Sequence, residues 1–196
     1  MALTESSMLQ LGFQAPDFDL PNIDGHTISR SHFLGRPLLI MFICNHCPYV
    51  KHVATELANI GTDYLDKEIG IVSIQSNDVD AYPDDSAEKM KEESEHRGYS
   101  FPYLLDSDQS VAKAYTATCT PDFFLFDANH KLAYRGRLDE TRPTRITSGV
   151  YDSKGNEANG GELRAAMDAV LSGNSPALEQ WPSMGCNIKW KPEKTA

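Results

Sequence analysis

The sequence predicts an α/β fold in which helices flank a central mixed sheet, with an N-terminal hairpin and a C-terminal tail. Residues 37–43 and 69–76 are mostly apolar runs, a pattern typical of strands buried on both faces. Helical spacing separates them, so the two strands should be parallel and joined by a right-handed crossover. Residues 122–136 have a strand, turn, strand pattern, which should close the sheet in antiparallel fashion.

The first quarter of the chain supplies a hairpin and the first strand–helix unit. Asp24-Gly25 is a turn pair between two short extended stretches, and one helical turn is expected over 31–34. Residues 37–43 form the first central strand. Pro48 suits the first turn of the following helix, because its missing N–H is not needed there.

After the second apolar run, the sequence predicts an exposed helix, a short strand and a short helix. Asp85 and Glu88 have the spacing of a capping box, and Gly98 is a stop signal. We interpret the charges of this helix as a solvent-exposed face. The short strand covers 101–106 and the short helix covers 107–115.

The region after the predicted antiparallel hairpin is less regular. Residues 136–161 show little periodicity, and a loop of that length is usually functional or disordered; the sequence leaves both open. Residues 161–173 have the spacing of an amphipathic helix that ends at Gly173. A tail over 174–196 completes the chain.

Length and composition favour one globular domain. A chain of 196 residues is expected to form a single domain, residues 1–196, with its core over about 12–173. An apolar content of 40% with 23% charged residues is ordinary for a packed protein. Four cysteines are too few for a disulfide-dense secreted scaffold, so we expect the sulfur atoms to do chemistry.

Charge and the N-terminal sequence limit the partners and the location. The net charge is −10 and no lysine or arginine cluster occurs, so neither nucleic acid nor a membrane is an expected partner. The first residues lack the basic start and apolar run of a signal peptide, and no run of eighteen apolar residues occurs. We therefore expect a cytoplasmic protein.

The motif Cys44-Asn45-His46-Cys47 lies where the first central strand gives way to the helix. The thiolate is the nucleophilic form of cysteine, and a helix N-terminus stabilises it through unpaired N–H groups and a partial positive charge. Cys47 falls on the same side of the first turn, so its sulfur can attack a mixed disulfide formed at Cys44. We assign Cys44 as the nucleophile and Cys47 as the resolving cysteine. This chemistry needs no cofactor.

His46 lies between the two cysteines. A partial positive charge on its ring would stabilise the Cys44 thiolate, so we predict a lowered pKa for Cys44 and a more oxidising disulfide. The alternative is an inert exposed histidine.

Two cysteines at this spacing are also half of a zinc site. Structural zinc needs a second pair at matching spacing, whereas Cys119 and Cys186 stand alone and far apart. We therefore favour redox chemistry without a bound metal. A redox-sensing or zinc-binding interaction module is the non-enzymatic alternative.

Three segments together resemble the thioredoxin-like superfamily, in the redoxin branch that contains the peroxiredoxins and their alkyl hydroperoxide reductase relatives. The stretch "GFQAPDFDLPNIDGHTISRSHFLGRPLLIMF" is similar to the N-terminal pattern of that branch, and "CNHC" is similar to its active-site CxxC. The stretch "TCTPDFFLFDANHKLAYRG" is similar to its Thr-Pro segment and closing hairpin. The resemblance implies a thioredoxin-like fold and a thiol-disulfide oxidoreductase.

The resemblance also implies roles outside the CxxC motif. It makes Pro121 a cis-proline facing the dithiol, and the backbone of Thr120 would then pair with an extended substrate beside Cys44. An ordinary trans proline at the start of an edge strand is the alternative. Cys119 would lie near the dithiol, and Cys186 shortly precedes a Trp-Lys-Pro, as a resolving cysteine does in peroxiredoxins. Both are possible additional redox residues.

The rival enzyme is a peroxidase that uses Cys47 or Cys44, with Cys186 as an extra redox cysteine. Peroxiredoxins carry a threonine or serine three residues before the peroxidatic cysteine and a proline further upstream. This chain has Cys44 and Ile40 at those positions, so the group that stabilises the leaving oxygen is missing. We therefore favour the thiol-disulfide oxidoreductase over the peroxidase. Its redox partner is expected to be a dithiol or disulfide protein, or a small thiol.

Overall fold

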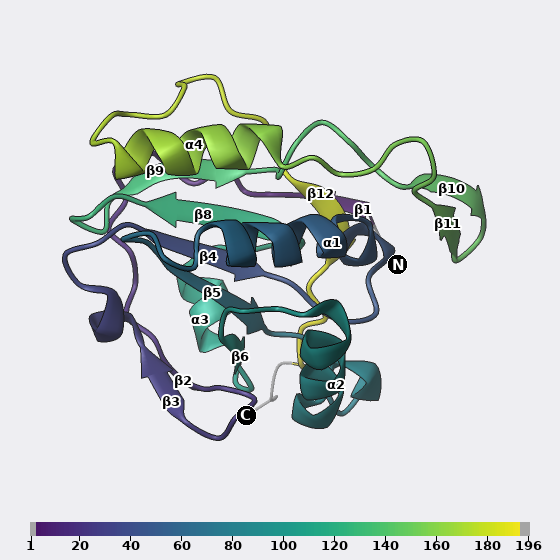
Figure 1. Cartoon of the computed structure of the whole chain (residues 1–196). Helices are drawn as coiled ribbons and strands as arrows, with labels where there is room; N and C mark the ends of the chain where they lie inside the picture. The colour runs from purple at the N-terminus through teal and green to yellow at the C-terminus, as the bar shows by residue number, and fades with distance from the viewer. Residues whose placement is uncertain (1–2, 193–196) are drawn as a thin grey trace.

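A five-stranded mixed sheet forms the centre of the computed structural model, which describes residues 3–192 (Figure 1). The strand order is β6-β5-β4-β8-β9. The strands are β4 (Leu38–Phe42), β5 (Gly70–Gln75), β6 (Tyr103–Leu105), β8 (Asp122–Phe126) and β9 (Leu132–Gly136). Strands β4, β5 and β6 are parallel, whereas β8 runs antiparallel to both β4 and β9. The predicted central mixed sheet is therefore confirmed.

Strand β4 is completely buried because apolar side chains cover both faces of the sheet. Leu39 and Met41 belong to one hydrophobic cluster, while Ile40 and Phe42 belong to the other. This alternation follows from the two-residue repeat of a strand, and it explains why the segment is apolar at every position.

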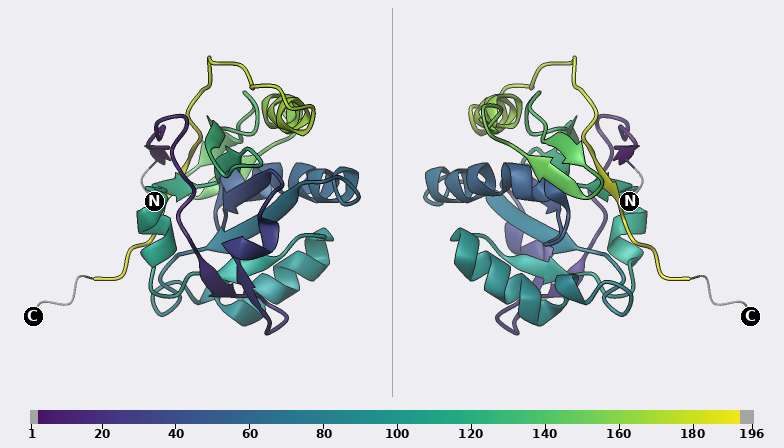
Figure 2. Two further views of the ribbon diagram at one scale, coloured as in Figure 1. Left: turned by 90° about the vertical axis from the view of Figure 1, so that its left-hand side faces the viewer. Right: turned by 90° about the vertical axis from the view of Figure 1, so that its right-hand side faces the viewer.

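Helices cover both faces of the sheet (Figure 2). On one face, α1 (Pro48–Asp63) and α4 (Gly161–Leu171) pack their apolar sides onto the first cluster. On the other face lie the short helix α3 (Ser110–Ala114) and the N-terminal segment, including Phe18. Helix α2 (Ala87–Arg97) lies beside β6.

The predicted N-terminal hairpin is present as β2 (Asp19–Pro21) and β3 (Thr27–Ser29), which pair antiparallel. A 3-10 turn, η1 (Arg30–Phe33), follows where one helical turn was predicted. Gly25 has φ of 87° in the turn, a conformation that glycine adopts without steric cost.

The start of α2 differs from the prediction. The N-cap of this helix is Ser86, whose hydroxyl accepts a hydrogen bond from the Lys89 N–H at 3.4 Å. Asp85 instead ends a short 3-10 turn, η2 (Pro83–Asp85), and is fully buried. The expectations that Asp85 caps the helix and belongs to a solvent-exposed face are wrong, because its carboxylate points into the interior. The predicted stop, Gly98, is confirmed in the left-handed conformation with φ of 73°.

The irregular segment 136–161 is ordered around one buried carboxylate. It contains the hairpin β10 (Thr144–Thr147) and β11 (Val150–Asp152), which projects near the start of α1 (Figure 1). The carboxylate of Asp139 accepts hydrogen bonds from the backbone N–H groups of Thr141, Asn159 and Gly160 at 2.7–2.8 Å. Both ends of the segment are thereby held together.

The C-terminal tail contributes the central strand of a second, three-stranded sheet. Strand β12 (Met184–Asn187) pairs antiparallel with β1 (Leu3–Glu5) and with β7 (Cys119–Thr120). This sheet lies at the end of the molecule where α1 begins (Figure 1). Residues 1–2 and 193–196 of the predicted domain and tail lie outside the described residues. Within residues 3–192, no helix has the length and apolar character needed to cross a membrane.

Candidate active site

Cys44 and Cys47 lie in the connection between β4 and α1. Cys47 is the N-cap of α1, and Pro48 occupies the first helical position, as predicted. Both cysteines are reduced and buried, with 1% of Cys44 and none of Cys47 exposed. A partner can therefore reach these sulfurs only after a local rearrangement.

Thr120 contacts the sulfur atoms of both Cys44 and Cys47. Its hydroxyl lies 3.2 Å from the Sγ atom of Cys44, and its carbonyl oxygen accepts a hydrogen bond from Sγ of Cys47 at 3.3 Å. The peptide bond between Thr120 and Pro121 is cis, as the family resemblance implied. The structure thus brings together the motif and the Thr-Pro segment, which are separated by more than seventy residues.

The two cysteines differ in acidity, and the order is opposite to our expectation. Burial raises the pKa of Cys44, and the neighbouring Cys47 and Asp85 raise it further. Burial alone would also raise the pKa of Cys47, but hydrogen bonds from the Cys186 and Cys44 thiols and from the Val50 backbone N–H lower it. The prediction of a lowered Cys44 pKa is therefore wrong, and Cys47 is the more acidic of the two thiols.

His46 faces a carboxylate that the sequence did not reveal as part of the site. Its Nδ1 atom lies 2.6 Å from Oδ2 of Asp85, and its ring stacks on Tyr82 with 5.5 Å between the centroids. Oδ1 of Asp85 also accepts the backbone N–H of Asn45 at 2.8 Å. The His46 ring is thus held against Asp85, and the Asp85 charge raises the pKa of Cys44.

A metal would have to displace existing hydrogen bonds at this position. Ligand atoms of Cys44, His46 and Asp85 lie within 4.8 Å of one another. The Asp85 carboxylate, however, is already occupied by the His46 ring, the Asn45 backbone and the side-chain amide of Asn77 at 2.8 Å. A structural zinc site would also need a fourth protein ligand. This donor set suits an internal hydrogen-bond network better than an ion.

The edge beside the cis-proline is occupied by the chain itself. Cys186 of β12 pairs with Thr120, and Asn187 pairs with Cys119. The expectation that the Thr120 backbone is open to an extended substrate is therefore wrong for this conformation. Its hydrogen-bonding position is filled by the C-terminal strand, which also covers the sulfurs.

The two remaining cysteines occupy opposite sides of this strand pair. Paired residues in a sheet point to the same side, so Cys186 shares the dithiol side with Thr120, whereas Cys119 points to the other side. The Cys186 thiol forms a hydrogen bond with Cys47. Cys119 instead donates to the carbonyl oxygen of Pro121 at 3.7 Å, and burial raises its pKa. Of the two possible additional redox cysteines, only Cys186 reaches the dithiol.

Asp122 is a second buried carboxyl group that sequence patterns missed. It follows Pro121 directly and is completely buried, and neither carboxyl oxygen has a hydrogen-bond partner among the described residues. Burial raises its pKa well above the ordinary value, so the fold favours the protonated form of this group.

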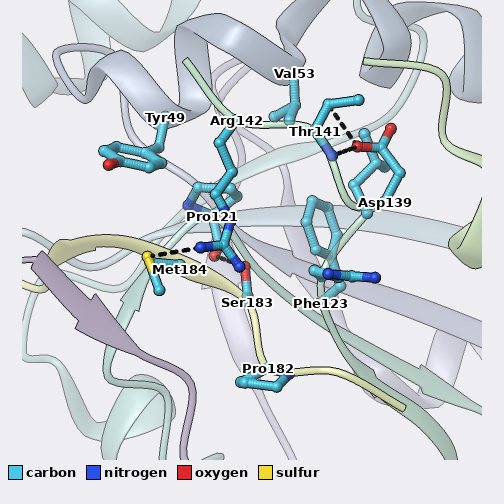
Figure 3. A pocket seen from close by; sticks show the side chains of 12 residues that line it. Tyr49, Val53, Pro121, Phe123, Asp139, Thr141, Arg142, Pro182, Ser183 and Met184 are labelled. Carbon is cyan, nitrogen blue, oxygen red and sulfur yellow. Dashed lines mark hydrogen bonds between the residues drawn. The ribbon is translucent and has the colours of Figure 1, made fainter. Parts of the chain in front are cut away.

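The segment after β9 holds the tail against the site. Arg142 donates a hydrogen bond from Nη1 to Sδ of Met184 at 3.3 Å, beside a cavity of about 30 Å³ that Tyr49, Pro121 and Ser183 help to line (Figure 3). The Ser183 hydroxyl donates to the carbonyl oxygen of Pro121 at 2.5 Å. The residues just before β12 are therefore fixed to the cis-proline.

Comparison with known proteins identifies the family. The sequence model of the AhpC/TSA family matches residues 11–135, more than half of the chain. The chain belongs to the AhpC/TSA family. This family uses thiol-based redox chemistry, and the thiol-disulfide oxidoreductase ResA of Geobacillus kaustophilus is 26% identical over 126 residues, covering 64% of this chain and 68% of ResA. A Mycobacterium tuberculosis protein provisionally named a peroxiredoxin is 27% identical over 116 residues, covering 59% of this chain and 69% of that protein.

Solved structures extend the likeness of this AhpC/TSA chain beyond the matched segment. An uncharacterized conserved protein from Geobacillus kaustophilus is 47% identical, with a TM-score of 0.90 and coverage of 98% of both chains. The thioredoxin domain of a Bacteroides vulgatus thiol-disulfide oxidoreductase has a TM-score of 0.57 at 20% identity, over 68% of this chain and 90% of that chain. The fold is therefore thioredoxin-like, as the sequence predicted.

Proposed function

We propose that this protein is a thiol-disulfide oxidoreductase in which Cys44 and Cys47 alternate between a dithiol and a disulfide. The observation that carries the proposal is the contact of Thr120 with both sulfurs at the start of a helix. Two thiols held side by side, with hydrogen-bond donors for a thiolate, have the arrangement that disulfide exchange requires.

In the proposed reaction, Cys44 attacks and Cys47 resolves. The Cys44 thiol first passes its proton to the thiolate of the neighbouring Cys47, the more acidic of the two. The Thr120 hydroxyl can then donate to the Cys44 thiolate, while the Cys47 thiol donates to the Thr120 carbonyl oxygen. Each sulfur therefore keeps a hydrogen-bond partner after the proton has moved, which limits the cost of placing the charge on Cys44.

The exchange transfers two electrons to the partner. The Cys44 thiolate attacks one sulfur of a partner disulfide, forms a mixed disulfide and releases the other partner sulfur as a thiolate. Cys47 then loses its proton and attacks Cys44, which forms the Cys44–Cys47 bond and releases the second partner thiolate. The partner is reduced and the motif is oxidised. A dithiol protein or a small thiol returns the electrons, and no prosthetic cofactor or metal enters the cycle.

Trapping of the mixed disulfide tests this proposal. Wild-type protein incubated with an oxidised dicysteine peptide should reduce the peptide and form one Cys44–Cys47 disulfide for each peptide consumed. Cys47→Ser protein should accumulate a peptide adduct on Cys44, and Cys44→Ser protein should form adducts at least about tenfold more slowly. Intact-mass measurement after acid quenching gives all three readouts. Faster adduct formation on Cys47 of the Cys44→Ser protein than on Cys44 of the Cys47→Ser protein would reverse the two roles. A wild-type protein that does not reduce the peptide would refute the function.

Hydrogen peroxide provides the comparison with the rival enzyme. The Thr120 hydroxyl contacts Cys44 and not Cys47, and Cys44 occupies the position where a peroxidase needs a hydroxyl group. We expect wild-type protein to consume hydrogen peroxide at least about a hundredfold more slowly than it reduces the peptide disulfide. Faster peroxide consumption that is lost only in the Cys47→Ser protein would favour the peroxidase.

A further inference from the structure

Strand β12 lies where an extended partner would lie. It runs antiparallel to β7, with Cys186 opposite Thr120. Gly185 packs so closely that an added Cβ would overlap the carbonyl oxygen of Thr120. Only glycine permits this approach, and the approach places the following residue over the dithiol.

The strand is anchored on both sides of Cys186. Before it, Ser183 bonds to the carbonyl oxygen of Pro121. After it, the backbone N–H of Lys189 donates to Oδ1 of Asn77, and the Lys189 carbonyl oxygen accepts a hydrogen bond from the side-chain amide of Gln109, each at 2.8 Å. The sulfur of Cys186 is therefore a fixed part of the site.

Cys47 lies between two thiols. Thr120 contacts both motif sulfurs, and Cys186, which is 4% exposed, pairs with Thr120 on the same side of the sheet. The thiols of Cys186 and Cys44 both lower the pKa of Cys47. This arrangement offers Cys47 two candidate disulfide partners, one in its own motif and one in β12.

We propose that Cys186 is a third redox cysteine, which takes over the disulfide from the CxxC motif. This inference rests on the proposed function, which supplies the Cys44–Cys47 disulfide. The Cys186 thiolate attacks Sγ of Cys47, the Cys47–Cys186 bond forms, the Cys44–Cys47 bond breaks, and Cys44 leaves as a thiolate that takes up the proton lost by Cys186. No net oxidation occurs, so the step needs no external oxidant.

Oxidation of the motif also removes the main obstacle to this attack. In the reduced protein, the hydrogen bond with Cys47 is the largest cause that raises the pKa of Cys186, followed by burial. A Cys47 sulfur that belongs to a disulfide carries no charge, so this cause disappears, while the nearby Lys189 still favours the Cys186 thiolate. Burial still raises the pKa of Cys186, but the Cys186 thiolate forms more readily beside the oxidised motif than beside the reduced one.

The transfer has two results for the enzyme. It regenerates the Cys44 thiol, while the Cys47–Cys186 disulfide keeps the protein in its oxidised form. It also joins β12 covalently to the start of α1, so the tail cannot leave the site until an external thiol reduces the new bond.

Disulfide mapping of the full-length protein tests the proposal. Reduced wild-type, Cys44→Ser, Cys186→Ser and Cys119→Ser proteins are oxidised with diamide, quenched in acid and digested. Wild type should contain both Cys44–Cys47 and Cys47–Cys186 links, and Cys44→Ser should convert fully to Cys47–Cys186. The Cys186→Ser protein should contain only the motif disulfide, and Cys119→Ser should match wild type.

A wild-type protein that forms only Cys44–Cys47, together with a Cys44→Ser protein whose Cys47 and Cys186 stay reduced, would overturn the inference and leave the proposed function intact. A Cys186→Ser protein that forms no Cys44–Cys47 link would instead refute the proposed function. Gly185→Val, which should push β12 away from Thr120, keeps the test independent of serine variants that fail to fold. It should slow Cys47–Cys186 formation at least about tenfold and still form the motif disulfide; an unchanged rate would contradict the proposal.

Discussion

Oδ2 of Asp85 lies 2.6 Å from Nδ1 of His46, so a carboxylate thirty-nine residues further along the chain sets the orientation of the motif histidine. The same carboxylate contributes negative charge next to Cys44 and raises the pKa of that thiol. Asp85 thus restrains the reactivity of the dithiol in addition to ordering the loop that carries it.

Replacing Asp85 with asparagine should make the dithiol more reactive. Loss of the negative charge removes one cause of the raised Cys44 pKa, so this pKa should fall and alkylation by iodoacetamide near pH 7 should become roughly tenfold faster. The pH dependence of alkylation in a Cys47→Ser, Cys119→Ser, Cys186→Ser background measures the shift. Asp84→Asn, at the exposed neighbouring position, is the matched control. Equal rates for the two variants would show that Asp85 does not act on Cys44.

Replacing Thr120 with valine should have the opposite effect on Cys44. Valine preserves the shape but removes the hydroxyl that lies 3.2 Å from Sγ of Cys44, and this hydroxyl lowers the Cys44 pKa. A hydrogen bond to a charged group contributes about 1.5–3 kcal/mol, so mixed-disulfide formation at Cys44 should slow about tenfold or more. Thr118→Val, whose hydroxyl bonds to the Glu5 carbonyl oxygen, provides the control. A trapping rate that does not change would exclude Thr120 as a donor to the thiolate.

Asp122 should make the folded protein less stable as the pH rises. Its pKa is raised in the folded state by burial, so its contribution is complete below the unfolded pKa near 3.8 and is lost progressively as the pH rises toward the folded value. Above the unfolded pKa, Asp122→Asn should remove a downward slope of up to about 1.4 kcal/mol per pH unit from the free energy of unfolding. Urea denaturation at several pH values measures it, with the exposed Asp19→Asn as control. Parallel curves for wild type and Asp122→Asn would disprove a protonated Asp122.

Asp139→Ala should release the segment 136–161. The substitution leaves the N–H groups of Thr141, Asn159 and Gly160 without their acceptor, at a cost of about 3 kcal/mol. Limited proteolysis should then cut at the β10–β11 hairpin much earlier than in wild type. Glu140→Ala, at the exposed neighbouring position, should leave the cleavage pattern unchanged. Resistance of Asp139→Ala to the protease would indicate that other contacts hold the segment.

Local sequence patterns predicted strand β4 and helix α1 well, because an unbroken apolar run and helical spacing are both strong signals of burial. The apolar run of β4 and the helical spacing after Pro48 placed the CxxC motif at a strand-to-helix connection, where the structure has it. The Thr-Pro segment also faces the dithiol, and its peptide bond is cis. These features depend on a few residues that are close together in the sequence or on a motif shared with the family.

Long-range contacts were beyond the reach of the sequence. Asp85 lies in a charged stretch that suits an exposed helix, and nothing in that stretch reveals that the residue before Ser86 points inward. The pairing of Gly185-Cys186 with Thr120 joins segments more than sixty residues apart, and no periodicity encodes that register. The acidity of Cys44 was predicted incorrectly for the same reason, since it depends on burial and on the distant Asp85.

Three of the four sulfurs belong to the hydrophobic cluster beneath α1, so the chemistry takes place inside the packed interior of the molecule. Each change in the bonding of Cys44, Cys47 or Cys186 alters the packing of residues that stabilise the fold. The reduced and oxidised forms should therefore melt at different temperatures, and a dye-based thermal-shift plate assay becomes a practical way to screen for the natural electron donor.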